Sequence, residues 1–135
     1  MPYIPDSKPD RPSQYSPLTL AFVGDGVYEL YVRTRLTAAE NIPAGKLHSR
    51  ATKYVKAAAQ AHSFRGIEGA LTESEMAVYK RGRNAKSPTV PKNADLTEYR
   101  IATGLEALFG FLYLSGEADR LRELMEMAFD AVVAV

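Results

Sequence analysis

LAFVGDGVYELYVRTRL, residues 20–36, is the stretch on which the interpretation of the chain depends. Apolar residues recur at helical spacing on most of its sides, which predicts a central, buried helix over about residues 17–36. Asp25 stands inside this segment between Gly24 and Gly26. A carboxylate buried there must be paired or bound to a metal ion, because leaving it bare costs on the order of several kcal/mol. The two glycines weaken the helix and predict that another element approaches closely at this point.

A second apolar stretch, DLTEYRIATGLEALFGFLYLSG (residues 95–116), repeats this arrangement. Its helical stripe places one carboxylate, Glu106, among apolar neighbours. Two helices that are apolar on most sides should pack against each other, which would bring Asp25 and Glu106 together. Carboxylates that converge without a cysteine or histidine cluster are hard oxygen ligands, and they suit Mg²⁺ or Mn²⁺ better than zinc.

The remaining segments also favour helices. Residues 46–65, 71–85 and 117–134 carry helical stripes or capping signals, and no segment shows the alternation of a strand. The predicted fold class is therefore all-α. Residues 1–15 hold four of the eight prolines and predict a loosely ordered N-terminal arm, while residues 16–135 predict a single domain that starts at Ser16-Pro17.

Composition narrows the class of protein. The 135 residues include no cysteine, which excludes disulfides, thiolate zinc sites and cysteine nucleophiles and agrees with a reducing, cytoplasmic compartment. No apolar run approaches the roughly 20 residues that span a bilayer, and the polar, proline-rich N-terminus does not resemble a signal peptide. We therefore expect a cytoplasmic protein without a membrane partner.

The charges are unevenly distributed although the net charge is only +1. Residues 41–67 and 76–94 contain no acid, yet they hold ten of the seventeen Lys and Arg residues. Basic surfaces of this kind suit a phosphate backbone, although solvated faces without a ligand are the alternative. The basic residues on both sides of the proline-containing loop should project into solvent, and they are Arg81, Arg83, Lys86 and Lys92. The candidate RNA-binding residues are Lys46, Arg50, Lys53, Arg81, Arg83, Lys86 and Lys92.

The acids also have structural explanations. A single carboxylate in a helical stripe is more often paired with an arginine than bound to a metal, which applies to Asp25 and to Glu106. Glu29 stands four residues before Arg33, and an ion pair along the helix is the expected role of Glu29.

Two motifs resemble those of a known family. LAFVGDGVYELYVR (residues 20–33) resembles the signature helix of the ribonuclease III domain, and TGLEALFGFLYL (residues 103–114) resembles its second catalytic motif. KRGRNAKSPTVPKNAD (residues 80–95), with no double-stranded-RNA-binding domain after it, is similar to the short bacterial branch of the family, Mini-ribonuclease III.

The resemblance implies a homodimeric endoribonuclease that cleaves double-stranded RNA by Mg²⁺-dependent hydrolysis, with Mn²⁺ as the alternative ion. It implies that Asp25 and Glu106 are catalytic and hold the metal, and that Phe22 plugs into a cavity of the partner subunit; a core phenylalanine is the alternative for Phe22. The implied substrate is precursor RNA of the large ribosomal subunit, 23S rRNA. Larger family members carry two further acids where this chain has Ala21 and Thr103, which leaves the number of bound ions open.

Two other functions remain to be distinguished. The reduced set of acids is compatible with a non-cleaving RNA-binding or ribosome-assembly module of the same fold. Another all-α metal-dependent phosphohydrolase, acting on nucleotides, would need repeated acids on one helix, and only Asp25 and Glu29 have that spacing. Incubation with labelled duplex RNA, with Mg²⁺ or with EDTA, separates the three functions.

Overall fold

The structure is a computed structural model that describes residues 11–87 and 89–133. Within these ranges every regular element is helical, which confirms the predicted all-α class. Two short 3₁₀ turns, η1 (Pro12–Gln14) and η2 (Glu68–Ala70), accompany the α-helices. The α-helices are α1 (Pro17–Ala39), α2 (Ala44–Val55), α3 (Ala57–Ile67), α4 (Glu73–Asn84), α5 (Leu96–Leu114) and α6 (Ala118–Val133).

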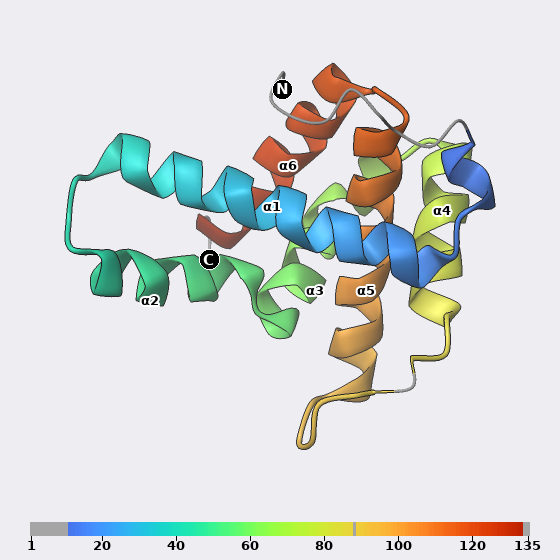
Figure 1. The fold of residues 1–135 in the computed structure, drawn as a ribbon, viewed down its shortest axis with the longest axis horizontal. Coiled ribbons are helices and arrows are strands. Elements are labelled where there is room, and N and C mark those ends of the chain that lie inside the picture. Colours follow the sequence, from blue (N-terminus) through green and yellow to red (C-terminus); the bar gives the residue numbers. More distant parts are fainter. Residues whose placement is uncertain (1–10, 88, 134–135) are drawn as a thin grey trace.

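Helix α5 is the centre of the fold. It packs against α1, α3, α4 and α6, and Figure 1 shows α1 crossing α5 while α2 runs back along α1. Almost every side of α5 is buried, as its apolar sequence predicts. Its buried residues are Ala102, Gly104, Leu105, Ala107, Leu108, Phe109, Gly110 and Leu112.

Glycines let α1 and α5 touch through their backbones. A Cβ atom on Gly24 would lie 1.7 Å from the carbonyl oxygen of Glu106, and one on Gly110 would lie 1.9 Å from the carbonyl oxygen of Leu20. No other residue fits at either position without moving a helix. The close approach predicted from Gly24 is confirmed. The same prediction for Gly26 is wrong, because nothing lies within 4 Å of a Cβ built there.

Helix α1 is less buried than its sequence predicts. It buries one face only, and Asp25 is exposed on another side, so the expectation of a buried aspartate is wrong. The reason is that small residues decide which face meets α5, whereas hydrophobicity favours larger residues such as Phe22, which is 81% exposed. The buried residues of α1 are Leu20, Ala21, Gly24, Val27, Tyr28 and Val32.

Side-chain caps define several helix ends where the sequence predicts them. Ser16 accepts a hydrogen bond from the Leu18 amide at 3.2 Å, and Thr72 and Glu75 form the predicted capping box of α4. Asp95 accepts from the Glu98 amide at 3.0 Å at the start of α5. Gly116, with a φ of 76°, allows the chain to turn after α5.

The single helix predicted over residues 46–65 is wrong, because the structure has two helices there. Lys56 adopts an extended conformation, with φ −65° and ψ 155°, between α2 and α3. The local sequence YVKAAAQA (residues 54–61) holds neither proline nor glycine, so propensity predicts no break. A side chain of the next helix stabilises the break, because Gln60 donates a hydrogen bond to the Val55 carbonyl oxygen at 2.8 Å.

The predicted N-terminal arm lies partly outside the described residues, which exclude residues 1–10. Its described end forms η1 and is fastened by Arg81, which donates to the carbonyl oxygens of Ser13 at 3.2 Å and Tyr15 at 3.3 Å. The boundary between an arm of residues 1–15 and a domain of residues 16–135 stays a prediction. In the described part of the chain, no helix has the length and apolar character needed to cross a membrane.

Candidate active site

The structure brings Asp25 and Glu106 together where α1 crosses α5. Gly24, which precedes Asp25, packs directly against the backbone of Glu106, and this contact fixes the two helices at their closest point. Asp25 is exposed, while Glu106 is largely covered by α1 and α3. The site therefore has one carboxylate open to solvent and one beneath it.

Burial is the main cause that raises the pKa of Glu106 to about 8. The second cause is the neighbouring Asp25 carboxylate, because a negative charge at close range disfavours ionisation of Glu106. Gln60 opposes the shift by donating a hydrogen bond from Nε2 to Glu106 Oε2 at 3.2 Å. Within the protein, the Gln60 hydrogen bond is the group that favours the ionised form of Glu106, and it does not outweigh burial and Asp25.

Gln60 is a site residue that the sequence does not reveal. It is only 2% exposed, and its Nε2 group bridges Glu106 and the Val55 carbonyl oxygen across the α2–α3 junction. Its Oε1 atom is buried without a hydrogen-bond partner. A glutamine inside an alanine-rich helix gives no sequence signal, because its role depends on a residue 46 positions away.

The donor atoms suit a hard divalent cation. The carboxylates of Asp25 and Glu106 and the free Oε1 of Gln60 are all oxygen ligands, and a cation would favour the ionised form of Glu106, which burial and Asp25 disfavour. Among the described residues, no cluster of three or more histidines, cysteines or acids could hold a metal. Mg²⁺ is commonly held by one or two carboxylates, with waters and substrate phosphates completing its shell. The pair of Asp25 and Glu106 therefore fits this ion.

The neighbouring positions add no further acid ligand. Ala21 is buried against Leu20 and Ala107, and the Thr103 hydroxyl donates to the Tyr99 carbonyl oxygen at 2.9 Å within its own helix. Glu29 lies one turn after Asp25 and forms the predicted ion pair with Arg33, at 3.1 Å.

Phe22 lies one turn before Asp25 on the exposed side of α1. With 81% of its surface exposed, it is not a core residue, and that alternative is wrong. Leu30, also on α1, is 46% exposed. Large apolar side chains exposed beside a candidate active site are typical of an interaction surface.

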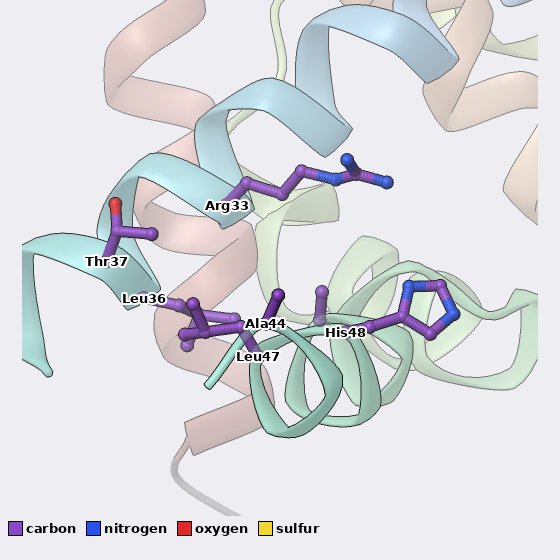
Figure 2. Close-up of a pocket in the computed structure, with 7 residues that line it drawn as sticks. Arg33, Leu36, Thr37, Ala44, Leu47 and His48 are labelled. Atoms are coloured by element: carbon purple, nitrogen blue, oxygen red, sulfur yellow. The ribbon is translucent and has the colours of Figure 1, made fainter. Parts of the chain in front are cut away.

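The predicted RNA-binding residues of α2 lie on its solvent side. Lys46, Arg50 and Lys53 are all exposed. Arg50 donates to Glu40 Oε2 at 2.5 Å, so its charge is already partly compensated. The opposite side of α2 faces α1 across a cavity of ≈200 Å³, and Figure 2 shows Leu36 and Leu47 next to each other, with the side chains of Arg33 and His48 extending away from them.

The other predicted RNA-binding residues separate into two groups. Lys86 and Lys92 lie exposed in the connection between α4 and α5, as predicted. Arg81 and Arg83 belong to the last turn of α4, where Arg81 is exposed, as predicted, and Arg83 is half-buried. Arg81 binds the backbone of the N-terminal arm, and the Arg83 guanidinium lies 5.7 Å from the centre of the Tyr79 ring.

Known proteins match this chain over most of its length. The model of the ribonuclease III domain matches residues 18–117. A Mini-ribonuclease 3 of Thermoanaerobacter is 50% identical over 87% of this chain and 82% of its own length, and one of Symbiobacterium thermophilum is 47% identical over 90% and 94%. A crystal structure of a Fusobacterium nucleatum protein superposes with a TM-score of 0.78 and 29% identity, covering 92% of this chain and 98% of that one.

The helical fold and the matched residues define a ribonuclease III domain, so the protein is an endoribonuclease, a hydrolase that acts on RNA. Within that class, the chain belongs to the Mini-ribonuclease 3 branch.

Proposed function

We propose that this endoribonuclease cleaves double-stranded RNA by hydrolysis that depends on Mg²⁺, with Mn²⁺ as the alternative ion, held by Asp25 and Glu106. The observation that carries the proposal is the convergence of these two carboxylates at the α1–α5 crossing, where burial and the neighbouring Asp25 raise the pKa of Glu106. The family's dependence on a divalent metal supports it.

The residues of the site have separate roles in this proposal. Asp25, exposed on α1, is placed to meet the scissile phosphate, while Glu106 holds its position beneath through Gln60. The chemistry that a bound divalent ion supplies is activation of water and neutralisation of charge on the phosphate. Lys46, Arg50 and Lys53 on α2 and Lys86 and Lys92 after α4 bind backbone phosphates of the duplex, which suits A-form RNA because its shape and phosphates are more accessible than its base edges.

We further propose that the enzyme is a cytoplasmic homodimer in which Phe22 enters the partner subunit. Its exposure beside Asp25 supports this arrangement, which would place two active sites along one duplex. Phe22→Ala is expected to weaken the free energy of dimer formation by on the order of 3–5 kcal/mol. It should therefore lower the fraction of dimer measured by sedimentation. Leu96→Ala, at an exposed apolar position on α5, is the control and should stay dimeric. A dimeric Phe22→Ala variant with a lower melting temperature would contradict the proposal.

The proposed natural substrate is the precursor of 23S rRNA. The test uses the intact chain with labelled RNA in Mg²⁺, Mn²⁺ or EDTA. Duplex RNA should be cut on both strands with either metal and left intact with EDTA, and a single strand of the same sequence should survive. A precursor transcript of 23S rRNA should be cut at discrete positions. Binding of duplex without cleavage in any metal would favour the non-cleaving module instead.

A further inference from the structure

Three arginines line a cavity that lies apart from the paired carboxylates. The cavity, of ≈440 Å³, is bounded by Arg65 from α3, Arg83 from α4 and Arg100 from α5. Only Arg83 among these was predicted to bind RNA. The other residues that line the cavity are Phe64, Glu68, Tyr79, Asn84, Thr97 and Ile101.

The floor of this arginine cavity is rigid. The Phe64 and Tyr79 rings stack with centroids 3.8 Å apart and an angle of 7° between planes, and they are 4% and 2% exposed. Arg83 lies over the Tyr79 ring and donates from Nε to Asn84 Oδ1 at 3.1 Å. A fixed floor and a held Arg83 reduce the conformational entropy that a ligand must remove on binding.

The charge of the cavity is not balanced by the protein. Three arginines and one acid, Glu68, line it. Among the described residues, neither Arg65 nor Arg100 has a hydrogen-bonded or ion-paired partner. Arg50 and Arg120, by contrast, are paired with glutamates. Like charges around one cavity repel each other, and an anion between them would be stabilised by all three.

The arginine cavity opens on a different face of α5 from the active site. Glu106 comes six residues after Arg100 and nine after Thr97, so the two lining residues lie about 120° and 180° around the helix axis from Glu106. No residue of α1 lines the cavity. The arginine cavity is therefore separate from the surface on which Asp25 lies.

We propose that the arginine cavity binds a backbone phosphate of RNA outside the cleaved duplex, from a single-stranded segment of the same folded molecule. Planar guanidinium groups bind phosphate oxygens through two parallel hydrogen bonds, and Thr97 and Asn84 offer further donors. The proposal goes beyond the cleavage reaction and requires neither Asp25 nor Glu106. Its consequence is selection of structured RNA over an isolated duplex.

The experiment compares a blunt duplex with the same duplex carrying a single-stranded extension, in EDTA and across a salt series. The parent should bind the extended RNA more tightly. In Arg65→Ala/Arg100→Ala, the preference for the extended RNA should fall by at least about fivefold at low salt. The slope of log affinity against log salt concentration should become flatter by about 0.7 for each phosphate contact that is lost. The variant should keep the parent's affinity for the blunt duplex and its cleavage rate with Mg²⁺.

Two matched variants make the result specific. Arg11→Ala/Arg122→Ala removes the same charge at exposed positions outside the cavity and should bind like the parent. Arg65→Lys/Arg100→Lys keeps the charge but not the planar fork and should be intermediate. Inorganic phosphate, added at constant ionic strength, tests a free anion as the ligand.

Equal RNA preference in the parent and Arg65→Ala/Arg100→Ala would overturn the proposal, as would an equal loss in the Arg11→Ala/Arg122→Ala control. A rise in melting temperature with inorganic phosphate in the parent, without any RNA preference, would assign the cavity to a small anion instead. A parent that binds extended RNA but cleaves nothing would refute the proposed hydrolysis and leave the arginine cavity supported.

Discussion

Glu75 in the corner between α4 and α6 and Glu106 at the α1–α5 crossing are both largely withdrawn from water, but their surroundings are opposite. Glu75 accepts two hydrogen bonds from Arg120, each 2.8 Å long, and a third from the Thr72 amide at 2.9 Å. Glu106 accepts one from Gln60, at 3.2 Å, and faces the carboxylate of Asp25.

The pKa shifts of the two glutamates have opposite signs. The hydrogen bonds from Arg120 are the main cause that lowers the pKa of Glu75, whereas burial and Asp25 raise that of Glu106 to about 8. The α4–α6 corner is complete without a ligand, while the α1–α5 crossing supplies no cation that would favour ionisation of Glu106. A perturbed group of the second kind is more typical of a functional site than of a structural one.

The largest expected effect is on catalysis. Asp25→Asn and Glu106→Gln should each abolish cleavage of duplex RNA, because each removes a charged ligand from the proposed metal site. Neither should lower thermal stability, since each relieves the repulsion between the carboxylates. Single-turnover cleavage and melting curves provide the measurements. A tenfold loss of turnover corresponds to a difference of only about 1.4 kcal/mol in the activation barrier. If Asp25→Asn keeps turnover within about tenfold of the parent, Asp25 is not a metal ligand.

Glu75→Gln should have the opposite outcome. Removing the charge leaves Arg120 without its main partner, and we expect a loss of about 3 kcal/mol in the free energy of unfolding. Cleavage per folded molecule should be unchanged. Chemical denaturation gives the stability, and Glu123→Gln, at the exposed second partner of Arg120, is the control, with an expected loss below about 1 kcal/mol. Similar losses for both variants would mean that burial of Glu75 is unimportant.

Gln60→Met tests the single hydrogen bond to Glu106. Methionine keeps the length and most of the volume of glutamine but has no donor, so Glu106 should lose its orientation. A fall of about 10- to 100-fold in activity or metal affinity is expected, as for other partners of metal ligands. The Mg²⁺ dependence of the rate and the thermal shift on adding Mn²⁺ report the two quantities.

Ser63→Ala is the matched control for Gln60→Met. Ser63 is buried on the same helix and donates to the Ala128 carbonyl oxygen at 2.9 Å. Its loss should lower stability without changing the Mg²⁺ dependence. If both variants lose activity in proportion to stability, Gln60 is only a structural residue.

The smallest expected effect is the pH dependence of stability in EDTA. A Glu75 carboxylate with a lowered pKa stabilises the fold above its ordinary pKa of 4.5, and that stability is lost as the pH falls through the folded value. Glu106 acts in the other direction, because its raised pKa makes stability decline as the pH rises from 4.5 to about 8. Glu75→Gln should therefore flatten the acid side of the profile and Glu106→Gln the alkaline side. Profiles parallel to that of the parent would contradict both assignments.

The sequence by itself determines the class, the main helices and the family. Long apolar stripes, capping boxes and the glycine beside Asp25 are local or periodic signals, and each predicts a feature that the structure contains. The convergence of Asp25 and Glu106 follows from the same signals, because two apolar helices with glycines in matching places pack closely.

Only the tertiary structure decides which groups are buried and what they contact. The sequence predicts a buried Asp25, but small residues turn the other face of α1 toward α5 and leave Asp25 in solvent while Glu106 is covered. The hydrogen bond from Gln60 to Glu106 and the arginine cavity depend on side chains far apart in the chain. Helix propensity and periodicity describe one segment at a time, so they contain no information on contacts that form only when α3, α4 and α5 are packed together.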